Sequence, residues 1–100
     1  MKLDHIAVTV DSIEDGIKWY QSKFDIEILY QDETWAMLRS SNPDLKIAMV
    51  IKSQHPNHIG IECKELPEFA ETGKFHRDGS EYHYETDPWG NTWEWVKYHK

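Results

Sequence analysis

The sequence holds a single cysteine, Cys63, among its 100 residues, which excludes an internal disulfide. We therefore expect a reducing, cytoplasmic compartment, with Cys63 as a buried strand residue. Cationic residues are also scarce, because 11 Lys and Arg stand against 18 Asp and Glu, for a formal net charge of −7. Nucleic acids and anionic membrane surfaces need clustered Lys and Arg, so neither is an expected partner.

Long apolar runs are absent, so no segment is predicted to span a bilayer. The strand-like pattern starts at Leu3, so we expect no signal peptide. Hydrophobic residues make up only 39% of the chain, and five Trp and five Tyr partly compensate because aromatic rings bury large areas. A single small domain with exposed sheet edges is the expectation, and it favours a homodimer.

The first half of the chain predicts one helix among four strands. Alternating, β-branched residues indicate a strand over 3–10. Apolar residues then recur at helical spacing over 13–24, after Asp11, which can cap the helix with Glu14 three residues later. We expect this helix to end near Phe24. Three further strands are predicted over 26–30, 34–39 and 45–52.

The second half repeats this order of elements with a shortened crossover. Strands are predicted over 58–63, 75–77, 81–86 and 91–98. Residues 65–73 contain Pro67 and predict a loop with one helical turn. Asp78-Gly79 is typical of a hairpin turn, and residues 87–90, with sequence DPWG, are typical of a type I turn. Each half therefore reads as a strand, a crossover and three strands.

Three polar residues stand out on the predicted strands. His5 and His58 lie near the start of equivalent strands, and Glu94 lies in the last strand between Trp93 and Trp95. If the core packs on the Ile, Val and Trp face, these three side chains point to the opposite face. Two His and one carboxylate can hold a divalent metal on one side and leave its other positions open, which suits Fe, Mn, Ni, Co or Zn.

Three segments of the chain resemble the vicinal-oxygen-chelate superfamily: LDHIAVTVDS at 3–12 followed by Trp19-Tyr20, NHIGIE at 57–62, and YETDPWGNTWE at 84–94. This superfamily includes glyoxalase I, methylmalonyl-CoA epimerase, extradiol dioxygenases, fosfomycin-resistance enzymes and bleomycin-binding proteins. The resemblance implies an α+β fold in which paired βαβββ modules form a curved mixed sheet, with a shortened helix in the second module. The modules would cover about 1–53 and 54–100 of one domain.

The resemblance also implies roles for individual residues. The family's metal positions fall on His5, His58 and Glu94. The fourth ligand of glyoxalases and epimerases falls on Ala48, which argues against glyoxalase I chemistry unless Glu62 or Glu27 replaces the missing carboxylate.

Other site residues are implied by the resemblance to extradiol dioxygenases. Tyr84 stands ten residues before Glu94, as their active-site Tyr does, and is the predicted catalytic residue. His76 lies near another site histidine of those enzymes, whereas their early acid–base His is Leu45 here. His83 alternates with Tyr84, so only one of the two can face the cavity, and we favour Tyr84.

Three functions remain open from the sequence. The favoured one is a metal-dependent lyase, isomerase or dioxygenase whose metal chelates two oxygens of a small substrate. The second is a metal-free binding protein, similar to bleomycin-resistance proteins, that holds a planar or cationic ligand in an aromatic groove. The third is an accessory domain with a vestigial cavity. Trp19, Trp93 and Trp95 are predicted to be core residues rather than part of a ligand platform.

Overall fold

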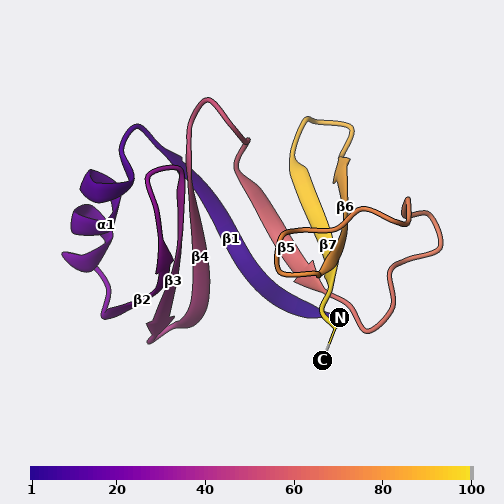
Figure 1. Ribbon diagram of the computed structural model, residues 1–100, viewed down its shortest axis with the longest axis horizontal. Coiled ribbons are helices and arrows are strands. Elements are labelled where there is room, and N and C mark those ends of the chain that lie inside the picture. The colour runs from indigo at the N-terminus through magenta and orange to yellow at the C-terminus, as the bar shows by residue number, and fades with distance from the viewer. Residues whose placement is uncertain (100) are drawn as a thin grey trace. The chain divides into compact units, whose positions relative to one another are not determined.

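The computed structural model describes residues 1–99 (Figure 1). In this range the chain forms one helix and seven strands: β1 (Lys2–Val10), α1 (Ile13–Gln21), β2 (Ile26–Gln31), β3 (Trp35–Ser41), β4 (Asp44–Ile51), β5 (His58–Glu62), β6 (Glu81–Thr86) and β7 (Thr92–Lys97). Parallel and antiparallel pairs both occur, which confirms the predicted α+β class with mixed strand pairing. The helix falls short of the length and apolarity that a membrane span needs.

The chain divides into two compact units. We call His5–Asn57 the helical unit, because it contains α1 together with β2, β3, β4 and most of β1. Met1–Asp4 and the chain from His58 onward form the strand unit, which contains the first residues of β1 and all of β5, β6 and β7. The grouping of both units in one domain stays a prediction.

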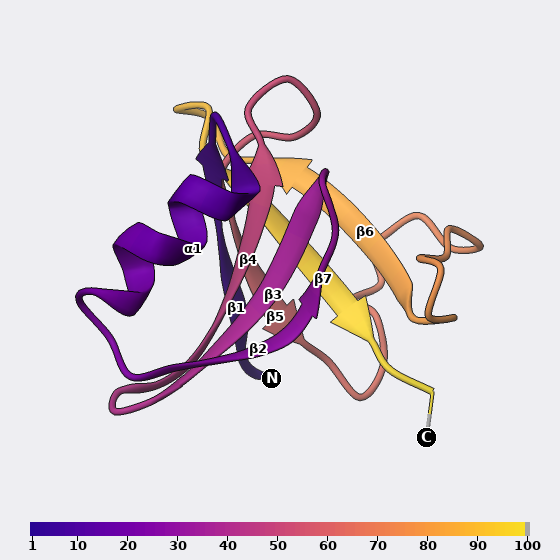
Figure 2. The ribbon, with the colours of Figure 1, turned by 60° about the vertical axis from the view of Figure 1, so that its left-hand side comes forward.

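In the helical unit, one face of the strands is covered by α1. Their order is β2-β3-β4-β1, with β1 and β4 parallel and the other pairs antiparallel. Figure 2 shows α1 lying across this face. The buried core consists of apolar side chains from the helix and the strands, namely Ile13, Ile17, Ala36, Leu38, Ile47 and Met49. Gly16 permits close packing, because a Cβ there would lie 2.6 Å from Met49 Sδ.

Both ends of α1 differ from the prediction. Ser12, not Asp11, is the cap: its backbone is extended and its Oγ accepts a hydrogen bond from the Asp15 amide at 3.3 Å. The helix ends at Gln21 rather than near Phe24. Its Trp19 is 55% exposed, so the predicted core position of this indole is wrong.

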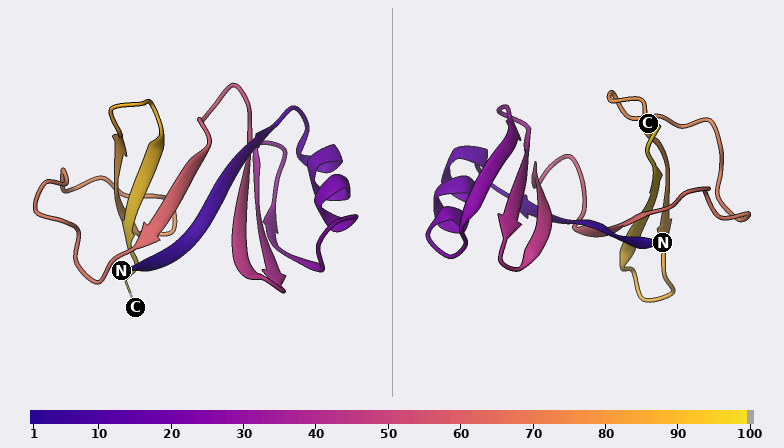
Figure 3. Two further views of the ribbon diagram at one scale, coloured as in Figure 1. Left: turned by 180° about the vertical axis from the view of Figure 1, so that it is seen from behind. Right: turned by 90° about the horizontal axis from the view of Figure 1, so that it is seen from below.

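The strand unit has the order β5-β7-β6, with β5 and β7 parallel and β6 and β7 antiparallel. Figure 3 shows the irregular connection that leads from β5 to β6. The shortened helix is reduced there to a single turn, in which the Ala70 amide donates to the Pro67 carbonyl at 2.9 Å. The predicted strand over 75–77 is a single bridge between Phe75 and Glu81.

Candidate metal centre

The pairing of β5 with β7 places His58 and Glu94 on the same face of the strand unit. His58 is in register with Thr92, and Gly60 is in register with Glu94, so the imidazole and the carboxylate are diagonal neighbours. His58 Nε2 lies 3.4 Å from Glu94 Oε1. Because Gly60 has no side chain, nothing on β5 directly opposite Glu94 competes with the imidazole for this space.

Glu94 is a buried carboxylate, with only 2% of the residue exposed. A buried charge is costly unless it is paired, hydrogen-bonded or bound to a metal. Besides His58, its partners are His76, whose Nε2 donates to Oε2 at 2.5 Å, and Tyr84, which bonds the carboxylate through its hydroxyl. Glu94 is therefore held at both oxygens by residues of its own unit.

Tyr84 stands directly opposite Glu94 in the antiparallel pair of β6 and β7. Its ring also meets the His58 imidazole edge-on, with ring centroids 5.3 Å apart. Burial first, and then the negative charge of Glu94, raise the pKa of the Tyr84 hydroxyl. Tyr84 therefore stays protonated near neutral pH and can donate a hydrogen bond.

His76 reaches this face from the connection between β5 and β6. The turn that follows it is closed by a hydrogen bond from the Gly79 amide to the His76 carbonyl at 2.9 Å, and Gly79 has a φ of 87°. The imidazole stacks on the ring of Tyr82, with centroids 3.9 Å apart. Tyr82 was not among the predicted site residues, although strand alternation places it on the same face as Tyr84.

His5 is the first residue of the helical unit and lies on β1, where it is 6% exposed. The preceding residue, Asp4, belongs to the strand unit, and its carboxylate accepts a hydrogen bond from the Tyr98 hydroxyl at 2.7 Å. The chain therefore passes from one unit to the other at the peptide bond between Asp4 and His5.

The position expected for a fourth ligand holds no donor atom. Ala48 is buried on β4 and stands opposite Ala7. The two carboxylates considered as replacements have other surroundings. Glu62 forms an ion pair with Lys2 at 3.6 Å, and Glu27 is exposed on β2 opposite Arg39. These three positions therefore give no support for a fourth ligand.

His83 lies on the opposite face of β6 from Tyr84. Its Nδ1 accepts a hydrogen bond from the Glu71 amide at 3.1 Å, and its ring lies 6.2 Å from the ring of Trp95. Trp93 and Trp95 share this second face and are half-buried rather than enclosed in a core. Their predicted core role is therefore only partly met.

The fold is that of the vicinal-oxygen-chelate superfamily. A variant of Streptomyces coelicolor methylmalonyl-CoA epimerase, in complex with 2-nitronate-propionyl-CoA, matches with a TM-score of 0.75 at 13% identity, over 100% of this chain and 99% of that one. Methylmalonyl-CoA epimerase in complex with methylmalonyl-CoA and ammonium matches with a TM-score of 0.70 at 13% identity, over 96% and 93%.

A further structure, described as an NAD-dependent benzaldehyde dehydrogenase from Legionella pneumophila, has a TM-score of 0.65 at 10% identity, over 94% of this chain and 97% of that one. No protein-family model matches the sequence, and no curated protein matches it significantly. At these identities the likeness establishes the fold alone, since one fold carries many activities.

Proposed function

We propose that the protein is a divalent-metal-dependent enzyme that acts on a small substrate through two neighbouring oxygen atoms. The metal ligands would be His5, His58 and Glu94, all of which are buried and offer one ligand atom each. The observation that carries the proposal is the buried pair of His58 and Glu94, with 3.4 Å between Nε2 and Oε1.

The donor set restricts the choice of metal. Imidazole nitrogens suit Fe, Mn, Co, Ni and Zn, whereas Mg and Ca prefer ligand sets made of oxygen atoms. His76 and Tyr84 support this assignment, because hydrogen bonds to a ligating carboxylate fix its orientation. A bound metal would supply Lewis-acid chemistry at its open positions.

The protein's own residues narrow the reaction. Tyr84 carries a proton on a hydroxyl beside Glu94 and can donate it toward a substrate oxygen. Ala48 has no group that could remove a proton, which weighs against glyoxalase-type chemistry at that position. The proposed ligands and Tyr84 fit better with a reaction that uses three protein ligands and a tyrosine donor, as in the extradiol dioxygenases that the sequence resembles.

One observation favours the second function considered from the sequence, a metal-free protein that binds a small molecule. Glu94 already has protein partners at both oxygens, namely His58 at Oε1 and His76 at Oε2. A carboxylate satisfied in this way does not require a cation for stability. Metal affinity therefore separates the two functions.

The deciding experiment titrates the full, chelator-treated chain with Co²⁺ and follows visible absorption and heat of binding. We expect one equivalent to bind, and we expect His5→Ala, His58→Ala and Glu94→Gln each to weaken binding at least about 100-fold. His55→Ala removes a histidine from the loop before β5 and should bind like the parent chain. Wild-type protein without saturable binding, or Glu94→Gln with unchanged affinity, would refute the metal site. The homodimer stays a prediction, which sedimentation of the parent chain checks.

A further inference from the structure

The strand unit has a second face, opposite that of His58 and Glu94, on which two indoles stand uncovered by any helix of residues 58–99. Strand register places Trp93 opposite Ile59 on one side and Glu85 on the other, and places Trp95 opposite Ile61 and His83. Both indoles remain half-buried, and Phe69 meets the ring of Trp95 edge-on at 5.2 Å and the ring of His83 at 6.2 Å. This face has room for a ligand.

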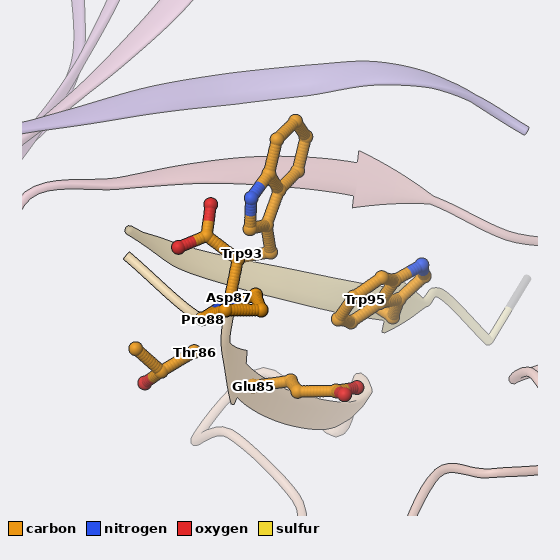
Figure 4. A pocket seen from close by; sticks show the side chains of 6 residues that line it. All are labelled: Glu85, Thr86, Asp87, Pro88, Trp93 and Trp95. Atoms are coloured by element: carbon orange, nitrogen blue, oxygen red, sulfur yellow. The ribbon is translucent and has the colours of Figure 1, made fainter. Parts of the chain in front are cut away.

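A pocket of about 600 Å³ opens on this face (Figure 4). Its lining residues come from the end of β6, the turn after it and β7, and they are Glu85, Thr86, Asp87, Pro88, Trp93 and Trp95. Figure 4 shows both indoles projecting from β7 and the carboxylates of Glu85 and Asp87 projecting from the neighbouring strand and turn. The pocket therefore combines aromatic surface with negative charge.

Asp87 is fixed in place by its turn. Its Oδ1 accepts hydrogen bonds from the amides of Trp89 and Asn91, and its Oδ2 accepts one from the Asn91 side chain, each at 2.9 Å. These bonds, that of the Asn91 side chain first, hold the pKa of Asp87 below its usual range, so the carboxylate is ionised at neutral pH. The turn thus provides a fixed negative charge at one end of the pocket.

Glu85 supplies the second charge, and its side chain is half-exposed. On this face His83 Nε2 lies 3.8 Å from the Glu85 carboxylate. No Lys or Arg is among the residues that line the pocket. Near neutral pH the lining is therefore anionic, and the chain's net charge of −7 adds to the attraction for a cation.

We propose that this pocket binds a small organic cation of the quaternary ammonium class, held against the indoles of Trp93 and Trp95 and between the carboxylates of Glu85 and Asp87. Indole faces attract cations through the ring quadrupole, and quaternary ammonium groups are the ligands that aromatic sites of this kind recognise. An anion would be repelled by both carboxylates, and a neutral apolar ligand would desolvate them without compensation. A quaternary ammonium group also needs no hydrogen-bond acceptor arranged around it.

The experiment compares choline with 3,3-dimethylbutan-1-ol, which has the same shape but carries carbon in place of the charged nitrogen. The indole N–H signals of the full chain are followed by NMR during each titration, with sodium chloride matched in ionic strength. We expect choline to shift the signals of Trp93 and Trp95 in a saturable manner, and the alcohol to bind at least about tenfold more weakly.

Two variants and one control test whether Glu85 and Trp95 bind the cation. Glu85→Gln, at a half-exposed position that tolerates change, should weaken choline binding roughly fivefold, and Trp95→Leu should weaken it more. Trp19→Leu removes the exposed indole of α1 and should leave binding unchanged. Equal affinity for choline and the alcohol, or no saturable shift up to about 0.1 M choline, would overturn the proposal.

The proposal is independent of the metal centre, since the pocket contains none of the proposed ligands. Chelator-treated protein and the Glu94→Gln variant should therefore bind choline as the parent chain does. Loss of choline binding in a Glu94→Gln protein with an unchanged circular dichroism spectrum would overturn the separation of the two sites.

Discussion

The helical unit and the strand unit differ in the kind of side chain that they bury. In the helical unit, α1 covers one face of the strands, and Leu38 and Met49 are fully buried beneath it. In the strand unit, Glu94 and His58 are buried, while Trp93 and Trp95 are only half-buried. Burial of apolar groups stabilises a fold, whereas burial of ionisable groups costs stability and is typical of functional sites. We infer that the helical unit provides most of the stability and the strand unit provides the chemistry.

The largest expected effect is on the free energy of unfolding, and it is tested by one substitution in each unit. Leu38→Ala removes a fully buried side chain and should lower the free energy of unfolding by about 2–5 kcal/mol. Trp93→Phe, on the open face of the strand unit, should cost less than about 1.5 kcal/mol because the indole is only half-buried and Phe keeps an aromatic ring there. Urea unfolding followed by circular dichroism measures both.

Leu29→Ala is the matched control for the first substitution. Leu29 is 47% exposed on β2, so its truncation should cost less than about 1 kcal/mol. If Trp93→Phe proved as costly as Leu38→Ala, the two units would share the stability evenly and the contrast between them would fail.

The next prediction concerns the chemistry of the strand unit. His76→Ala removes the partner of Glu94 Oε2 and should raise the dissociation constant for Co²⁺ about 10–100-fold, because outer hydrogen bonds orient a ligating carboxylate. His76→Gln retains a side-chain donor and should recover part of the affinity. The measurement is calorimetric titration of chelator-treated protein.

His99→Ala is the control for this prediction, because it removes an exposed histidine of the same unit. Its affinity for Co²⁺ should equal that of the parent chain. A His76→Ala variant that bound Co²⁺ more tightly than the parent would show that His76 competes with the metal instead of supporting the site.

The sequence predicted the regular strands of both units better than the ends of the helix. Strand β6 was predicted with its observed bounds, Glu81–Thr86, because alternation between two clear turn signals defines both ends. The helix cap was misplaced by one residue, since Asp11 and Ser12 are both good caps. Backbone geometry decides between them, because Ser12 has a φ of −141° and a ψ of 129°.

The same limits apply to the candidate site. Period-two alternation predicted that His58 and Glu94 share a face, whereas Tyr84 was preferred to His83 on the resemblance to extradiol dioxygenases. The register of β5, β6 and β7 brings His58, Glu94 and Tyr84 together. His76 could not be placed in this way, because it reaches Glu94 from an irregular connection that has no periodicity. The open face of Trp93 and Trp95 was missed because both indoles were predicted to be core residues, although the crossover beside them was expected to be a loop with one helical turn.

The smallest expected change in unfolding free energy comes from a substitution at the N-terminal cap of α1, which tests whether this helix stabilises the helical unit. Ser12→Ala removes the Oγ that accepts the Asp15 amide and should cost about 1 kcal/mol of unfolding free energy, whereas Ser12→Asp should retain most of it, because an aspartate also caps and favours a helix N-terminus. Ser53→Ala, in an exposed loop of the same unit, serves as the control for loss of a hydroxyl. Amide hydrogen exchange should quicken in α1 and in Leu38 and Met49 beneath it. Unchanged exchange at those two residues, with α1 itself frayed, would show that the strands of the helical unit are stable without their helix.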